Sequence, residues 1–217
     1  MLKGRAPFVS AWLATAAYDP TGARVVVLTE LPGPHSLPAS EHMSTATILR
    51  PGADEHSAYF GRYIEKVPDG DIVALLRDQI GETCALLRRA RGQADFAYAP
   101  GKWTVKQVVG HLADVERVMA FRALWFARND QTPLPGFDEN RWVDDSDFAS
   151  RTLDDLIDEF EVVRAATVQL ATHLDASALA RRGTMNGNPG TPRALFYIIA
   201  GHERHHVALF RERYNLR

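Results

Sequence analysis

Three histidines have the residue type and the spacing of a metal site. His202 and His206 are four residues apart, so on a helix both imidazoles point to the same side, and they take positions in the apolar stripe of that segment. His111 takes a similar inward position between Val108 and Val115. Three neutral imidazoles can hold one divalent ion and leave a coordination position open for water or substrate. They meet only if the two helices bring His111 to the level of the pair.

The alternative is that each of these histidines is an ordinary core or surface residue. Burying an imidazole without a partner costs on the order of 1–3 kcal/mol. Three such costs at one place make the ordinary explanation less favourable than a shared cation. The sequence therefore predicts a metal site.

The segment from His202 to His206 also matches the H-E-x-x-H pattern of zinc proteases, in which the glutamate is the general base. Those enzymes take a third ligand from further along the chain, but no His, Asp or Cys follows His206. We therefore do not favour a protease of that class. Glu203 is kept as a candidate catalytic proton acceptor, with a solvated carboxylate at the bundle edge as the alternative. His205 is expected beside the ligands or on the surface.

Four amphipathic segments must position these side chains. Their apolar residues recur every three or four positions, which predicts helices. Thr104 and Gln107 form a capping box at one helix start, and Thr191 followed by Pro192 marks another. With no convincing strand in this part of the chain, we expect an all-α fold, an up-down antiparallel four-helix bundle. The expected long helices cover residues 72–91, 104–129, 152–174 and 191–214.

The sequence also predicts where three charged residues near His111 lie. Arg122 continues the seam of His111 three turns further on and is expected to mark a polar end of the pocket. Asp114 and Glu116 are expected on the helix surface. Residues 132–150 and 181–190 are expected to be loops, and parts of both, 137–142 and 185–188, could rim the pocket.

The first 42 residues differ from the rest. The segment 23–31 reads as one strand without a partner elsewhere, and a Pro-rich turn follows it. A preceding apolar run with Lys3 and Arg5 resembles a secretory signal, but it is short and is interrupted by Pro7. We expect residues 1–42 to be a weakly ordered N-terminal extension, or to precede the true start at Met43. Residues 43–217 form the expected bundle domain.

Composition excludes several classes of protein. The 217 residues carry 25 Lys and Arg against 27 Asp and Glu, a net charge of −2. A chain this close to neutral has no overall positive electrostatic field that would attract nucleic acid. There is no apolar run long enough for a membrane span, and we expect a cytoplasmic protein. Cys84 is the only cysteine, so no disulfide framework or cysteine metal site exists, and it is expected in the core.

The sequence resembles the DinB-like superfamily from about residue 55 onward. The resemblance rests on the segments KWTVKQVVGHLADVERVMAFRALWFARND, PLPGFDEN and RALFYIIAGHERHHVALFRERY, in that order and spacing. It implies a four-helix bundle that binds a divalent ion through His111, His202 and His206. It also implies a homodimer.

Related proteins include bacillithiol S-transferases and a mycothiol-dependent maleylpyruvate isomerase, in which the metal activates a thiol. The resemblance thus implies an enzyme that uses one divalent ion, Zn, Ni, Fe or Mn, with a low-molecular-weight thiol or water, as a transferase or hydrolase acting on a small molecule. The alternative is a non-catalytic metal-binding bundle that serves as a stress-related interaction module.

Overall fold

The computed structural model describes residues 12–18, 24–30 and 47–217, in two compact units, Met1–Ser44 and Thr45–Arg217. In the first unit, strand β1 (Trp12–Tyr18) pairs antiparallel with β2 (Arg24–Glu30), and Trp12 lies opposite Glu30. The expectation that the strand at 23–31 has no partner is therefore wrong. Its partner was missed because WLATAAY is alanine-rich and has a weak strand propensity.

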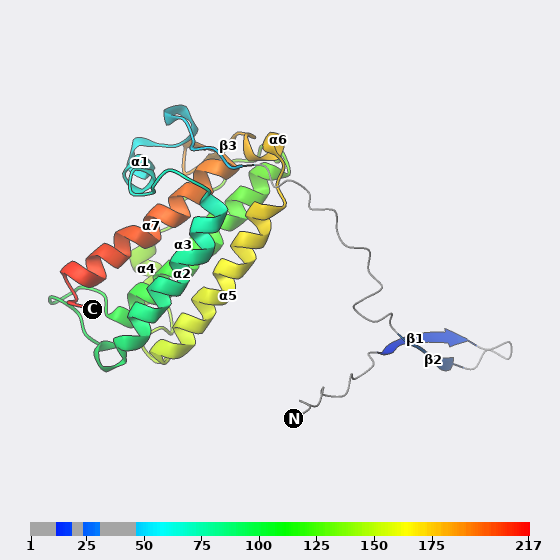
Figure 1. Ribbon diagram of the computed structural model, residues 1–217, viewed down its shortest axis with the longest axis horizontal. Coiled ribbons are helices and arrows are strands. Elements are labelled where there is room, and N and C mark those ends of the chain that lie inside the picture. Colours follow the sequence, from blue (N-terminus) through cyan, green and yellow to red (C-terminus); the bar gives the residue numbers. More distant parts are fainter. Residues whose placement is uncertain (1–11, 19–23, 31–46) are drawn as a thin grey trace, which may run out of the picture. The chain divides into compact units, whose positions relative to one another are not determined.

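Four long helices form the second unit (Figure 1). The all-α four-helix bundle that the sequence predicts is confirmed, and the observed helices end within a few residues of the expected bounds. The long helices are α2 (Ile72–Arg89), α3 (Val105–Ala127), α5 (Leu153–Thr172) and α7 (Pro192–Glu212).

Side-chain caps fix the starts of these helices. Asp71 accepts hydrogen bonds from the first backbone amides of α2, and Thr152 and Thr191 do the same for α5 and α7. At α3, Thr104 and Gln107 form the predicted reciprocal capping box. Because caps are local, they place the start of α3, and hence His111, independently of the rest of the bundle.

The directions of the helices are less regular than a simple up-down bundle. Lys106 at the start of α3 donates to the carbonyl of Ala149 just before α5, and Tyr214 after α7 donates to the carbonyl of Trp103 just before α3. Thus α3 runs parallel to α5 and antiparallel to α7 (Figure 1). The connection 128–152 returns along the bundle, so the expected up-down alternation does not hold between α3 and α5.

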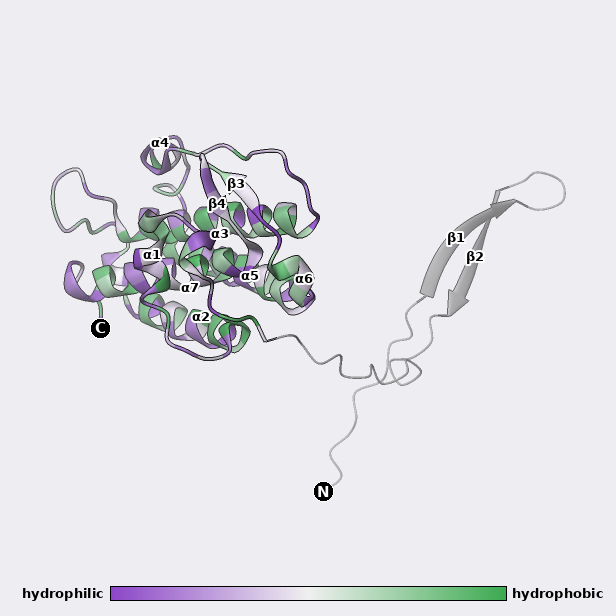
Figure 2. Cartoon of the chain, turned by 90° about the horizontal axis from the view of Figure 1, so that it is seen from above, coloured by the Kyte–Doolittle hydropathy of each residue, from purple (hydrophilic) through white to green (hydrophobic). Residues whose placement is uncertain are grey.

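A polar layer divides the bundle core into two apolar clusters. One cluster joins the first half of α2 and α7 to the last half of α3 and α5, and the other joins the remaining halves. Each bundle helix contributes buried polar residues between them. Both hydrophobic and hydrophilic residues are distributed around these helices in Figure 2. The layer consists of Gln79, Thr83, His111, Glu116, Arg164, Thr167, His202, Glu203 and His206.

Short elements lie between the long helices or before the first of them: α1 (Ala58–Ile64), α4 (Glu139–Asp144), α6 (Ala176–Leu179), β3 (Gly183–Met185), β4 (Asn188–Gly190) and the 3-10 turns Ala53–Glu55 and Arg91–Gln93. The expected loop at 181–190 is a β-hairpin, whose turn residues Asn186 and Gly187 both have positive φ, as a two-residue hairpin turn requires. The expected loop at 132–150 contains α4.

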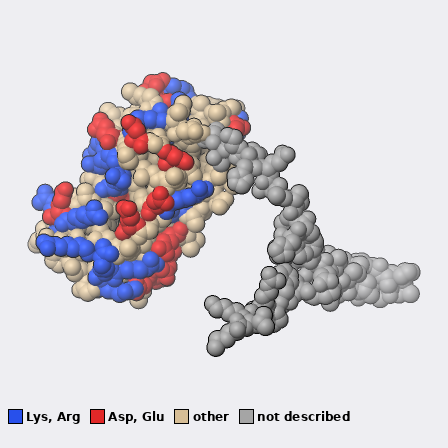
Figure 3. Space-filling model, in the orientation of Figure 1, with Lys and Arg blue, Asp and Glu red and all other residues tan. Residues whose placement is uncertain are grey.

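Charged residues of both signs are interspersed on the visible face of the second unit (Figure 3). Among the described residues, no helix is both long and apolar enough to cross a membrane.

Candidate metal centre

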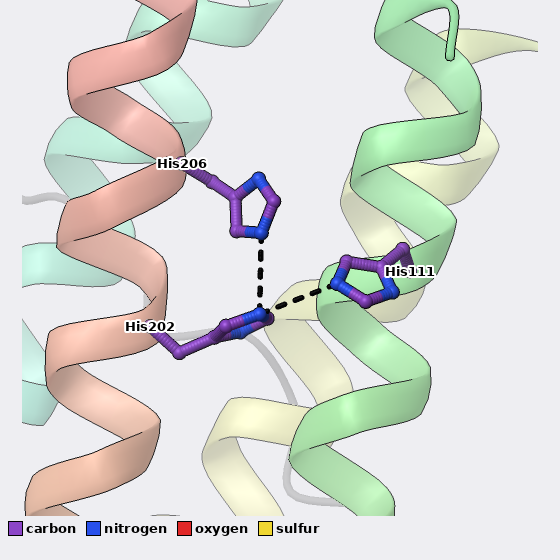
Figure 4. Close-up of side chains that lie close together, drawn as sticks. All are labelled: His111, His202 and His206. Carbon is purple, nitrogen blue, oxygen red and sulfur yellow. Dashed lines mark hydrogen bonds between the residues drawn. The ribbon is translucent and has the colours of Figure 1, made fainter. Parts of the chain in front are cut away.

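The bundle brings the three predicted histidines together. His202 and His206 project from α7 toward His111 on α3 (Figure 4). Nε2 of His202 lies 3.2 Å from Nε2 of His111 and 3.2 Å from Nε2 of His206. One ring nitrogen from each residue lies within 4.8 Å of the other two.

Burial keeps these imidazoles neutral. Their exposed fractions are 7%, 7% and 8% in chain order. Desolvation lowers the pKa of His111 to about 4, and desolvation with the neighbouring imidazoles holds the pKa of His202 and of His206 well below the usual value. Neutral imidazoles offer lone pairs, which is the form that a metal ion binds.

The arrangement of nitrogens fits a divalent cation better than a set of hydrogen bonds. A neutral imidazole nitrogen either donates one proton or accepts through one lone pair, so Nε2 of His202 cannot make both 3.2 Å contacts as good hydrogen bonds. Ligand nitrogens around a tetrahedral zinc ion at about 2.0–2.1 Å lie about 3.3 Å apart. The observed separations therefore match neighbouring ligands of one ion.

A glycine precedes each helix's first site histidine and lets another segment approach closely. A Cβ on Gly110 would lie 2.5 Å from the ring of Phe148, and a Cβ on Gly201 would lie 2.0 Å from the backbone oxygen of Tyr63 in α1. Any larger residue would push these segments away. The glycines before His111 and His202 thus allow Phe148 to pack directly on α3 and Tyr63 to pack directly on α7.

A cavity of about 800 Å³ opens on the three histidines. The ring of Trp103 lies 4.7 Å from that of His111, and the ring of Tyr63 lies 5.4 Å from that of His202. Phe137 and Asn186 also line the cavity, which confirms that both expected loops contribute to its rim. Sequence reasoning missed Tyr63, because no spacing relates α1 to the histidine helices.

Arg122 lines the same cavity and is only 4% exposed, which confirms that it reaches the pocket; that it marks a polar end stays a prediction. His205 also lines the cavity but lies outside the three-histidine cluster, and its ring packs against those of Tyr63 and His206. Cys84 is fully buried in the core, as expected, and burial raises the pKa of its thiol to about 12.

Glu203 lies in the buried polar layer and not in the wall of the large cavity. It is 1% exposed. One of its carboxylate oxygens accepts from Thr83 at 2.5 Å, and the other contacts Gln79 and, at 2.7 Å, Arg164. This burial shows that the alternative, a solvated carboxylate at the bundle edge, is wrong, and the role of Glu203 as a proton acceptor stays a prediction.

Arg164 joins Glu203 to a second buried carboxylate. Its guanidinium donates to both oxygens of Glu116 at 2.8 Å, in addition to its contact with Glu203. Glu116 is 3% exposed, so its expected place on the helix surface is wrong, whereas Asp114 is partly exposed and pairs with Arg117. The sequence carries no local signal for this cluster, because each partner lies on a different helix.

Comparisons with known proteins agree with this fold. A protein of Geobacillus thermodenitrificans named "Putative metal-dependent hydrolase" is 28% identical over 121 residues, covering 54% of this chain and 66% of that protein. A protein with the same designation from Bacillus licheniformis is 34% identical over 126 residues, covering 54% and 67%. The matched segment thus spans about two thirds of these relatives.

Two solved structures share the fold. YfiT from Bacillus subtilis, described as a probable metal-dependent hydrolase with an unusual four-helix bundle topology, superposes with a TM-score of 0.58 at 22% identity, over 70% of this chain and 93% of YfiT. A mycothiol-dependent maleylpyruvate isomerase gives a TM-score of 0.54 at 14% identity, over 67% of this chain and 61% of the isomerase. The sequence profile of the DinB superfamily matches residues 76–210, more than half of the chain, and the protein therefore belongs to the DinB superfamily.

Proposed function

We propose that this protein is a metal-dependent hydrolase that holds one divalent ion through His111, His202 and His206. The observation that carries the proposal is the convergence of three buried, neutral imidazole nitrogens at the wall of a large cavity. The names of the curated relatives support the same reaction class. A divalent ion in such a site supplies Lewis-acid chemistry, because it acidifies a water or thiol ligand and polarises a substrate carbonyl.

The chain's own residues prepare the site for that chemistry. The three histidines come from two helices, so they leave the cavity side free for a ligand. Tyr63 and Trp103 pack beside His202 and His111 and restrict the rotation of their rings. The aromatic rings of Tyr59, Phe60 and Phe137 also line the cavity and offer packing surface for the body of a substrate.

Thiol-dependent group transfer is a second candidate. The cavity, at about 800 Å³, has room for a small organic co-substrate beside the substrate. The isomerase that shares the fold depends on mycothiol by its name. A small-molecule substrate suits either reaction, and the predicted ion is Zn, Ni, Fe or Mn. The homodimer and the cytoplasmic location stay predictions.

The test is a panel of esters, amides and electrophilic thiol acceptors, assayed with zinc-, nickel-, iron- or manganese-loaded protein, with and without a low-molecular-weight thiol. We expect turnover by the wild type and by His173→Ala, whose histidine is exposed at the end of α5, and none by His206→Ala. Turnover that needs the thiol favours the transferase. Equal rates in all three proteins would contradict catalysis at this site, and no turnover by any metal-loaded protein would favour a non-catalytic metal-binding bundle.

A further inference from the structure

Arg122 is buried, and no other residue of the described part of the second unit supplies it with an acidic partner. Among residues 47–217, no Asp or Glu oxygen lies within 4.0 Å of its guanidinium, although the residue is only 4% exposed. Its Nη2 donates to the carbonyl of Pro135 at 2.7 Å, and its Nη1 faces the sulfurs of Met119 and Met185 at 3.7 and 3.8 Å. The equally buried Arg164 is paired with two carboxylates.

An unpaired buried cation is costly, and the surroundings of Arg122 do little to offset that cost. Thioether sulfurs are weak acceptors, and the ring of Phe137, 5.7 Å away, supplies a modest cation–π attraction. Burial lowers the pKa of Arg122, which reflects the missing counter-charge. An anion that binds from outside the chain would supply the counter-charge and offset the cost of burying this arginine.

The cavity provides a route for that anion. Arg122 and His111 both line it, and they lie eleven residues apart on α3. Eleven residues correspond to almost whole turns, so both side chains leave the helix on one face, about 16 Å apart along its axis. The other charged residues of the lining are Arg62 and Glu139, which leaves a net positive charge before any metal ion is counted.

We propose that Arg122 binds the carboxylate of the substrate, about three helical turns from the three histidines. The inference rests on the proposed function in taking this cavity as the substrate site. The planar guanidinium matches a carboxylate with two parallel hydrogen bonds, and the aromatic and apolar lining between the two ends accommodates the substrate body. The substrate class is thus a small organic acid whose reactive bond lies well away from its carboxylate.

The test measures binding of 4-phenylbutanoate, its uncharged amide and inorganic phosphate by titration calorimetry, with metal-free and zinc-loaded protein. We expect both forms of the wild type to bind the acid at least about tenfold more tightly than the amide. Arg122→Met should remove this preference and Arg122→Lys should retain part of it. The thermal midpoint of Arg122→Met should stay equal or rise, since Met119 and Met185 surround the site. Arg77→Met, on the exposed side of α2, is the matched control and should bind as the wild type does.

Several results would overturn the proposal. Equal affinities for acid and amide, no binding of the acid to either form, or an unchanged preference in both Arg122 variants would each contradict it. Tighter binding of phosphate than of the acid would refute the carboxylate assignment. Because the acid is tested without metal, the outcome is separate from the proposed function: absence of zinc binding, measured on the same samples, would contradict the metal centre and leave the role of Arg122 standing.

Discussion

Replacing Arg164 by methionine tests whether the polar layer holds the bundle together. The guanidinium of Arg164 donates to both oxygens of Glu116 at 2.8 Å, pairs with Glu203 at 2.7 Å and donates to the carbonyl of Leu76 at 3.1 Å. All three charged side chains are at most 3% exposed, so methionine would leave two buried carboxylates close together without a cation.

The size of the effect follows from that burial. Breaking a buried ion pair by removing one partner costs about 3–5 kcal/mol, a large part of the free energy of unfolding of an ordinary domain. For a protein of this size the thermal midpoint shifts by about 2–4 °C per kcal/mol, so we expect a fall of about 6–20 °C. Thermal and urea unfolding followed by far-UV circular dichroism measure both quantities.

Two further variants make the result specific. Arg88→Met removes a partly exposed arginine that pairs with Asp158 and Glu161, and should cost about 0–1 kcal/mol. Adding Glu116→Gln and Glu203→Gln to Arg164→Met removes the unpaired charges and should recover much of the loss. If Arg164→Met costs no more than Arg88→Met, the reasoning about the buried cluster is refuted.

Two other predictions concern the site and its walls. Gly201→Ala should lower the thermal midpoint, because its methyl group would lie 2.0 Å from the oxygen of Tyr63, whereas Gly81→Ala, with nothing within 4 Å, should be neutral or stabilising; equal midpoints would contradict the close approach of α1. Below about pH 6.5 the unfolded chain takes up a proton at His111, whereas the folded metal-free protein does so only near its lowered pKa of about 4. The free energy of unfolding should therefore decrease as the pH is lowered from about 6.5 to about 4, by up to about 1.4 kcal/mol per pH unit from this residue. His202 and His206 act in the same direction. Urea unfolding across this range should show a shallower fall for His111→Gln, and identical slopes would contradict the neutral buried imidazole.

Much of the fold was predictable because its determinants are local. The starts of α3 and α7 follow from Thr104 and Thr191, each of which acts on amides within three residues. The inward phase of His111 follows from its own helix. Both features can be read from the sequence without the tertiary structure, and they are sufficient to select the three histidines.

The remainder depends on long-range contacts. Glu116 reads as a surface charge until Arg164, 48 residues later and on another helix, is placed beside it. The shared direction of α3 and α5 depends on the path of the 128–152 connection, which is long enough for either direction. The hairpin at Asn186 and Gly187 was missed although its turn residues are typical, because three-residue strands carry little pattern.

The three-histidine metal centre predicts the number of zinc ions bound per chain after reconstitution and removal of free metal, which elemental analysis determines. We predict about one ion per chain for the wild type and for His173→Ala, and almost none for His111→Ala and His206→Ala, each shown to be folded by circular dichroism. A wild type that retains no zinc, nickel, iron or manganese, or histidine variants that retain a full equivalent, would contradict the three-histidine metal centre.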